Sequence, residues 1–375
     1  MRRLCALLLA LLIPCCAAAE TLPAAIDQAV AGLDLTELEA ALTADAPFAA
    51  TGGLRETIRA VARGEMTLGL DELMQMLSNR FLGAAKTSLW RLTRLMIPAL
   101  LWSVLRHLSG KGGEAGQAAC YLLICAFLAS DLADHAALCT DAVAKMSGGM
   151  QGLFPVLLTL MTAMGGASGS AIMQPALAAA SGMMTGVISS VTLPLTIASA
   201  MLTMLTHLGD GLRVSRLAGL VRQLATWTLG GSFTAFIGVL VTRGVTAAAV
   251  DGVTLRTAKY TLDNFVPVVG GLFADTVDTL VGSAMLVQSA LGVTGLLLLI
   301  ASCAAPLCQT LAAGLMYRLA AALMEPVGDG PLSRCIHDFS GVIMLLFVIE
   351  LCAAAMFVML IAQVIAVSSM TVMLR

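Results

Sequence analysis

The residues of this chain that could do chemistry are carboxylates set within apolar sequence. Two aspartate pairs, Asp131/Asp134 and Asp275/Asp278, have i, i+3 spacing, so each pair shares one face of a helix. Glu350 lies in the middle of the apolar run 341–363. An acid in hydrocarbon is unfavourable and is typically kept to bind protons or cations. The alternative, which we favour for both aspartate pairs, is that they mark segment ends at the membrane interface. Glu350, as a candidate intramembrane acid, does not fit that alternative.

No motif for catalysis or for a cofactor is present in the sequence. Residues 165–169 are glycine-rich but lack the lysine of a P-loop, and no GxSxG, HExxH or GxGxxG pattern occurs. The ten cysteines form no CxxC pair, which argues against a metal site. A net charge of −2, without a long basic run, argues against a nucleic-acid partner. We therefore expect a protein that is not an enzyme and uses no cofactor.

The most specific local pattern lies between residues 259 and 331. It starts with Asn-Phe-x-Pro-x-x-Gly, which indicates a broken or re-entrant helix, because proline removes a backbone donor and glycine permits unusual dihedral angles. It ends with Pro-x-Gly-x-Gly-Pro, which is typical of a turn. The residues that carry the two patterns are Asn264, Phe265, Pro267, Gly270, Pro326, Gly328, Gly330 and Pro331.

Together with a short Met-Leu-Arg tail, these patterns resemble the stage III sporulation protein AE family. The resemblance is specific over residues 259–375 and looser over residues 86–258. It implies a membrane-embedded component of the secretion-like channel complex between mother cell and forespore, which is needed for endospore formation and late forespore gene expression. It also implies other stage III sporulation proteins and a forespore membrane partner as binding partners. The implied location is the mother-cell membrane that surrounds the forespore.

Two other functions remain open on the sequence. One is an autonomous ion-coupled secondary transporter, in which Asp275, Asp278 and Glu350 would bind the ion or substrate. The other is a membrane scaffold that recruits partners of the same complex and conducts nothing.

The elements that must position these residues are transmembrane helices. Hydrophobic residues make up 59% of the chain and charged residues 12%, which favours an all-α polytopic membrane protein in the lipid bilayer. Apolar runs predict spans near residues 92–108, 118–138, 225–241, 265–291, 292–313 and 341–366, with two or three more between 146 and 207. Because not every run need form a span, and 265–291 is the weakest of them, we expect roughly six to eight spans in total. GxxxG spacing at Gly148, Gly165 and Gly182 indicates close packing between helices.

The first nineteen residues have the layout of a cleavable signal peptide. Arg2 and Arg3 precede a short apolar stretch, and three alanines precede Glu20. A lipoprotein anchor at Cys15 or Cys16 is the alternative, but Pro14 disfavours it. Residues 1–19 are therefore expected to be a signal peptide, residues 20–86 an extracytoplasmic amphipathic helical region, and residues 87–375 the multi-pass membrane domain.

Overall fold

A computed structural model describes residues 30, 54–63, 70–108, 113–163, 167–206, 214–265, 270–325 and 331–373. The side chains of residues 244–265 and 270–281 lie outside this description. The elements are α3 (Leu54–Ala62), α4 (Leu70–Leu108), α5 (Gly113–Ala163), α6 (Ala167–Val187), the π-turn η2 (Ile188–Thr192), α7 (Leu193–Thr206), α8 (Ser215–Phe265), α9 (Gly270–Met324) and α10 (Pro331–Met373). No strand occurs in these ranges, so the predicted all-α fold is confirmed.

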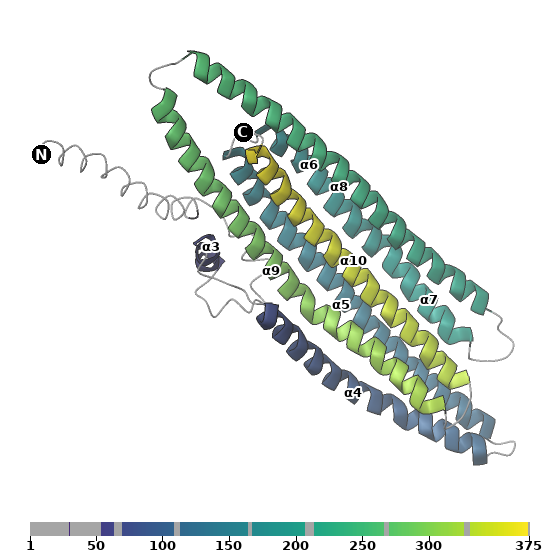
Figure 1. Cartoon of the computed structure of the whole chain (residues 1–375). Coiled ribbons are helices and arrows are strands. Elements are labelled where there is room, and N and C mark those ends of the chain that lie inside the picture. Colours follow the sequence, from purple (N-terminus) through teal and green to yellow (C-terminus); the bar gives the residue numbers. More distant parts are fainter. Residues whose placement is uncertain are drawn as a thin grey trace, which may run out of the picture.

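The long helices run antiparallel, side by side, in one elongated bundle (Figure 1). We call the end where α4, α7 and α9 finish the proximal end, and the opposite end the distal end. α10 lies inside the bundle, against α9, α5, α8 and α7. Its Phe339 and Phe357 side chains are fully buried. The short helix α3 packs on α9, away from the proximal end.

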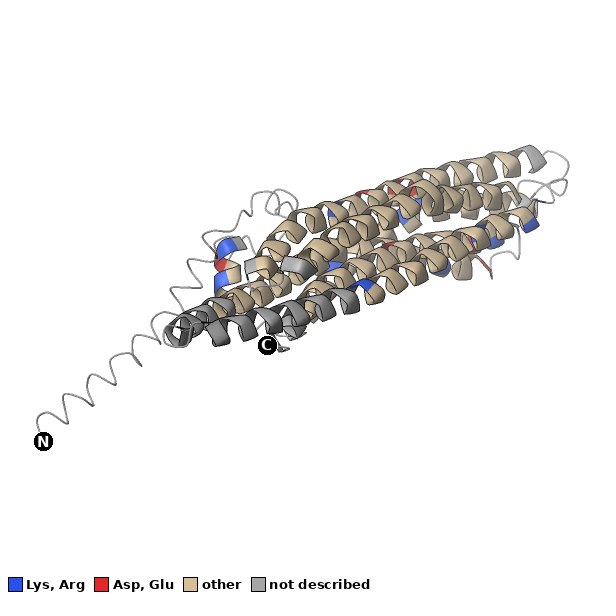
Figure 2. Cartoon of the chain, turned by 90° about the horizontal axis from the view of Figure 1, so that it is seen from above, with Lys and Arg blue, Asp and Glu red and all other residues tan. Residues whose placement is uncertain are grey.

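Five helical segments within the described ranges are long and apolar enough to cross a membrane. They are Gly116–Thr162, Ser170–Thr206, Ser215–Arg243, Gly282–Met324 and Leu332–Val367. Helices suit this setting because every interior backbone group is hydrogen-bonded within its own segment. Figure 2 shows how few charged residues interrupt the long helices. The polytopic membrane fold is therefore confirmed.

The number of candidate spans, five, is just below the expected six to eight. The reason is that apolar runs predicted as separate spans belong to continuous helices. The run 146–207 holds the end of α5 and one further span, and the runs 265–291 and 292–313 both belong to α9. Residues 92–108 form the end of α4. This helix is not among the five candidate spans, because its first half is polar and it carries several arginines. α4 packs on α5 and α9 as a sixth long helix.

Proline can kink or break a helix, but the prolines at 155, 175 and 194 do not interrupt the helices here. Helices α5 and α6 continue through Pro155 and Pro175. Pro194 lies two residues after the end of η2, and the Thr192 hydroxyl donates to the Val187 carbonyl at 3.3 Å, five residues back. Because proline has no N–H to offer, a widened turn is a common way to keep the surrounding helix intact. The 60-residue apolar stretch is therefore not broken into extra spans.

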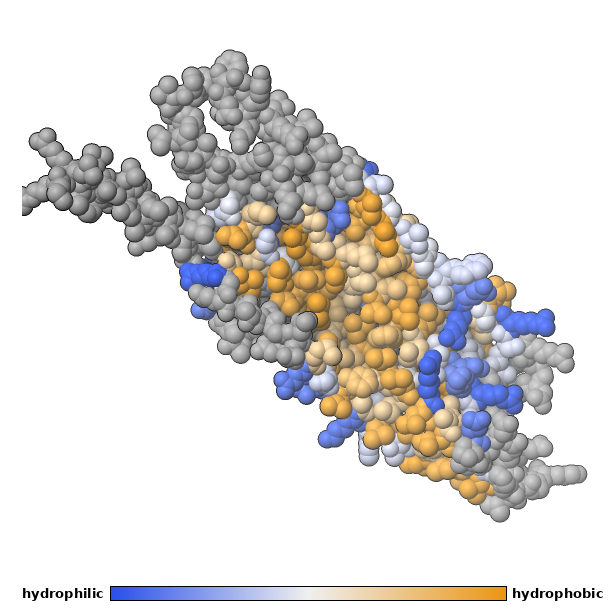
Figure 3. All heavy atoms as spheres, viewed as in Figure 1, coloured by the Kyte–Doolittle hydropathy of each residue, from blue (hydrophilic) through white to orange (hydrophobic). Residues whose placement is uncertain are grey.

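Exposure separates a lipid-facing helix from the core helices. In the most apolar part of the α8 span only 17% of residues are buried, against 67% in α9. Large side chains such as Trp227 and Val241 point outward from α8. The face drawn in Figure 3 is mainly hydrophobic over the middle of the bundle, and its hydrophilic residues gather toward the proximal end. This distribution is that of a bundle with an apolar band for lipid.

Of the three predicted domains, the signal peptide at 1–19 lies outside the described residues. The region 20–86 is described at Val30, in α3 and in the first part of α4. The expected boundary between residues 86 and 87 falls inside α4, which continues without interruption from Leu70 to Leu108.

Candidate functional site

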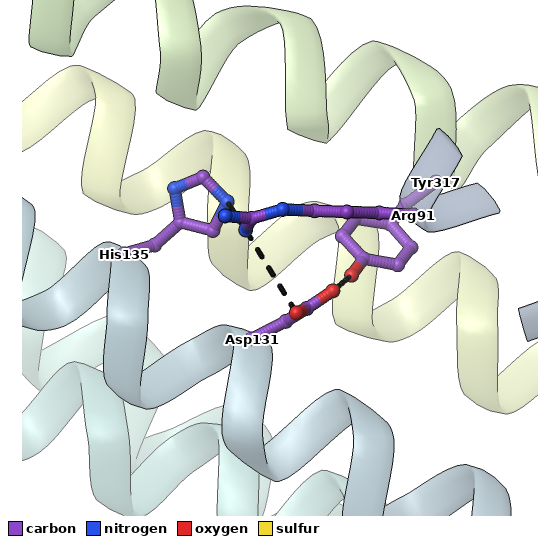
Figure 4. A network of polar contacts seen from close by, with 4 residues as sticks. All are labelled: Arg91, Asp131, His135 and Tyr317. Carbon is purple, nitrogen blue, oxygen red and sulfur yellow. Dashed lines mark hydrogen bonds and ion pairs between the residues drawn. The ribbon is translucent and has the colours of Figure 1, made fainter. Parts of the chain in front are cut away.

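A cluster of four polar side chains joins α4, α5 and α9 (Figure 4). Arg91 Nη1 lies 3.8 Å from Asp131 Oδ1 and 3.4 Å from His135 Nε2. The Tyr317 hydroxyl donates a hydrogen bond to Asp131 Oδ2. Asp131 therefore receives a cation from α4 and a hydroxyl donor from α9, on opposite oxygens of one carboxylate.

Helix geometry and aromatic packing position these four groups. Asp131 and His135 are four residues apart, so they lie on one face of α5, which is the face toward α4. Tyr317 is buried and packs edge-on against Phe339 of α10, with ring centroids 5.0 Å apart. Edge-to-face packing of this kind holds the phenol ring in one orientation. The Arg91 side chain arrives from α4 and is 38% exposed.

The contact with Arg91 determines which ring nitrogen of His135 carries the proton. A guanidinium group can only donate, so Nε2 of His135 must accept from Arg91, and the ring proton then lies on Nδ1. Nδ1 is buried and has no hydrogen-bond partner among the described residues. The cluster thus holds one unmatched donor in an otherwise paired network.

Two cavities adjoin the cluster on either side of Arg91. The larger, of about 330 Å³, lies between α4, α5 and α9, and its lining includes Arg80, Arg91 and His135. The smaller, of about 180 Å³, is lined by Arg91 and Arg94 together with Asp131 and Asp134. Arg94 also lies over the Phe127 ring, 4.8 Å from its centroid. The two cavities therefore differ in charge: the smaller has two acids beside its two arginines, and the larger has no acid among the described side chains that line it.

Beyond this cluster, α5 carries a charged stripe, which we define by Asp134, Asp141 and Lys145. Asp134, Asp141 and Lys145 are spaced by seven and four residues, so they lie on one helix face. All three are exposed, and Lys145 Nζ lies 2.9 Å from Asp141 Oδ2. From Asp131 to Lys145 the helix rises about 21 Å, most of the ~30 Å of a bilayer's hydrocarbon. Within the bilayer, charges this far apart could not all lie at one interface.

Glu350 lies at the centre of the bundle. Its side chain is fully buried on α10, and the Thr310 hydroxyl of α9 lies 3.1 Å from Oε1. Oε2 has no hydrogen-bond partner among the described residues. The Cys139 thiol of α5 lies beside the same carboxyl group. Glu350 lies in the candidate span Leu332–Val367, and its role as an intramembrane acid stays a prediction.

The structure separates the two sequence patterns that carried the family resemblance. Asn264 and Phe265 end α8, and Gly270 begins α9, whereas Pro331 begins α10 at the other end of α9. A helix of 55 residues is about 80 Å long, so the two patterns cannot form one site. Pro267, Pro326, Gly328 and Gly330, and the side chains of Asp275 and Asp278, lie outside the described residues. Their functional roles stay predictions.

Sequence reasoning identified Asp131 but not its partners. The sequence predicts that Asp131 and Asp134 mark segment ends, and it does not indicate Arg91 as a partner of Asp131. The i, i+4 spacing of Asp131 and His135 could have indicated a shared polar face. Nothing in the sequence could have indicated Tyr317, because it lies 186 positions away from Asp131.

Comparisons with known proteins identify the family. The stage III sporulation protein AE (spore_III_AE) family matches residues 53–368. Stage III sporulation protein AE of Bacillus subtilis (strain 168) is 32% identical over 236 residues, which cover 63% of this chain and 59% of that protein. The match thus spans less than two thirds of the relative's length. No solved structure matches the chain. Because the family match takes in most of the chain, all five candidate spans included, this protein belongs to the stage III sporulation protein AE family and has a role in sporulation.

Proposed function

We propose that the protein is a membrane-embedded, non-enzymatic subunit of the channel complex between mother cell and forespore. Family membership supports a role in sporulation, and the five apolar spans support a place in the membrane. The complex, its other stage III subunits and its forespore partner are part of this proposal, as is the location in the mother-cell membrane around the forespore.

The observation that carries the proposal is the charged stripe of α5, formed by Asp134, Asp141 and Lys145. An exposed charge at the centre of a bilayer is unfavourable by about 2.5–3.5 kcal/mol on insertion scales, so such residues normally face water or a protein partner. The stripe rises about 16 Å from Asp134 to Lys145, so it is long enough to follow a conduit or a subunit interface through about half of the hydrocarbon. Such a surface suits a subunit that packs against partners or lines a path for water.

The test replaces the stripe with apolar residues and compares two readouts. Full-length protein with Asp141→Leu and Lys145→Leu should still accumulate, because leucine is favourable in lipid. Affinity purification from sporulating cells of the native host should recover fewer stage III partners with this variant, and spore counts should fall at least about tenfold. The matched control is Thr226→Leu, an exposed position on the lipid-facing helix α8.

Two results would contradict the proposal. One is wild-type protein that purifies without any other sporulation protein. The other is a double variant that sporulates as well as the control at equal protein level.

The transporter remains the second candidate because of Glu350. A fully buried acid with one unpartnered oxygen is the kind of group that binds a proton or an ion in transporters. Solute or ion flux through liposomes that contain only the purified protein would favour this function. A subunit that needs partners should show no such flux.

A further inference from the structure

The larger cavity beside the polar cluster has the chemistry of an anion site. Two arginines, Arg80 and Arg91, line it, and none of the described aspartates or glutamates does. Neutral hydrogen-bond donors complete the lining: the amides of Asn79 and Gln309, and the hydroxyl of Ser88. Guanidinium groups together with neutral donors are the usual ligands of phosphate oxygens.

His135 closes one side of the cavity. It lines the cavity and is 5% exposed. Because Nε2 accepts from Arg91, Nδ1 carries the ring proton, but Nδ1 is buried away from the open space of the cavity. The donors that a ligand can reach are therefore those of the two arginines and of the neutral side chains.

The position of the cavity allows a ligand to enter from the flank of the bundle. Asn79 and Thr87 of α4 are exposed, whereas Ser88 and His135 are buried, so the lining runs from an open rim to a closed floor. Along α4 the cavity lining extends from Asn79 to Arg91, a rise of about 18 Å. A cavity of this length has room for a lipid head group as well as for a small anion. Basic cavities between membrane helices are known to take the head groups of anionic lipids.

We propose that this cavity binds an anionic phosphate group, with Arg80 and Arg91 as its charged ligands. The phosphate belongs either to the head group of an anionic phospholipid or to a soluble phosphate, since both present the same oxygens. The proposal does not depend on the channel function, because it rests only on the lining of this cavity.

The neighbouring cavity provides the matched control. Arg94 lines it together with Asp131 and Asp134, so the charge there is already balanced. Arg80→Gln removes a cation from the proposed site, Arg80→Lys retains it, and Arg94→Gln removes the same charge from the balanced cavity. Arg80 is preferred to Arg91 for the test, because Arg91 also pairs with Asp131 and its loss could unfold the cluster.

Binding is measured on full-length, delipidated protein in detergent, by the shift of the thermal unfolding midpoint. The probes are inorganic phosphate and phosphatidylglycerol in mixed micelles, with phosphatidylcholine as the comparison of zero net charge. We expect one or both anionic probes to raise the midpoint of the wild type. We expect Arg80→Gln to weaken the apparent affinity about tenfold, since it loses a charge-assisted hydrogen bond. Arg80→Lys and Arg94→Gln should stay within about threefold of the wild type.

The two probes distinguish the sources of the phosphate. A response to phosphatidylglycerol alone identifies a lipid head group, and a response to inorganic phosphate alone identifies a soluble anion. A response to neither probe overturns the proposal. Equal loss in Arg80→Gln and Arg94→Gln also overturns it, because the effect would then be one of overall charge.

Discussion

At the scale of single residues, the hydrogen bonds of Thr310 determine how Glu350 is held. The Thr310 hydroxyl lies 3.0 Å from the Pro306 carbonyl and 3.1 Å from Glu350 Oε1, but it has a single proton to donate. If the proton goes to the Pro306 carbonyl, as is common for threonine in a helix, Glu350 must donate to the threonine oxygen. A protonated, neutral Glu350 satisfies both contacts and also avoids a buried charge.

We therefore predict that Glu350→Gln is tolerated. Glutamine keeps the size of the side chain and supplies an N–H donor to Thr310, so protein level and spore counts should stay within about twofold of the wild type. Glu350→Lys should instead lower the protein level strongly, since a buried lysine on a membrane helix is unfavourable by about 2.5–3.5 kcal/mol. Western blots and spore counts measure both effects.

Glu325→Gln, at an exposed position just after α9, is the matched control for loss of an acid. Normal accumulation of Glu350→Gln together with complete loss of sporulation would show that the charge itself is essential. That outcome would favour the ion-coupled transporter.

At the scale of elements, close helix contacts occur at glycines other than those in the GxxxG patterns. A Cβ added at Gly148 or Gly182 would meet no atom within 4 Å, so these positions are not points of close approach. On α9, a Cβ at Gly295 would lie 2.7 Å from Leu153 Cδ2 of α5. Leu153 is itself buried in the core, so it has little room to move. The spacing of glycines indicated tight packing but not which helix faces meet.

Gly295→Leu should consequently destabilise the bundle. Overpacking a core position is unfavourable by about 1–3 kcal/mol, which should lower the thermal unfolding midpoint of the purified protein by several degrees. The matched control is Gly231→Leu on α8, where an added Cβ meets nothing within 4 Å. Equal midpoints for the two variants would mean that α5 and α9 do not approach as closely as this packing requires.

At the scale of the whole molecule, the helices are longer than a bilayer is thick. α5 and α8 have 51 residues each and α9 has 55, which correspond to about 75–80 Å, against ~30 Å of hydrocarbon. Modest tilt does not absorb this difference. The bundle must therefore project well beyond the membrane, where helices can contact soluble parts of other proteins.

Charge predicts which end of the bundle is cytoplasmic. Arg216, Arg222, Arg318 and Arg334 lie on the proximal halves of their helices, and the sequence adds Arg213 before α8. By the positive-inside rule, the proximal end with residues 209–222 faces the cytoplasm, and residues 20–86 face outside. Single cysteines at Ser215 and Arg63, in a background without native cysteines, test this assignment.

An impermeant maleimide applied to intact cells should label Arg63→Cys at least about tenfold more than Ser215→Cys. After the cells are opened, the maleimide should label both cysteines to the same extent, and this measurement serves as the control. Equal labelling before opening would mean that the orientation is inverted or that both segments lie on one side.

The sequence alone determined the class of this protein. Composition and the length of the apolar runs are enough for an all-α membrane fold, because a spanning segment must satisfy its backbone internally whatever its neighbours are. Local patterns around Asn264 and Pro331 were also enough to identify the family. Both kinds of information lie in short stretches of chain, and neither depends on which helix packs beside which.

Only the tertiary structure decided how many runs join into one helix and which polar groups meet. Hydropathy does not show that α9 is continuous through Pro306, because that continuity depends on packing along its length. The contact of Asp131 with Tyr317 joins residues 186 positions apart in the sequence, and the contact of Glu350 with Thr310 joins residues 40 positions apart. Buried polar groups need specific partners, and those partners come from whichever helices share a face in the bundle. Helix order and rotation, which local sequence does not encode, therefore set the chemistry of the site.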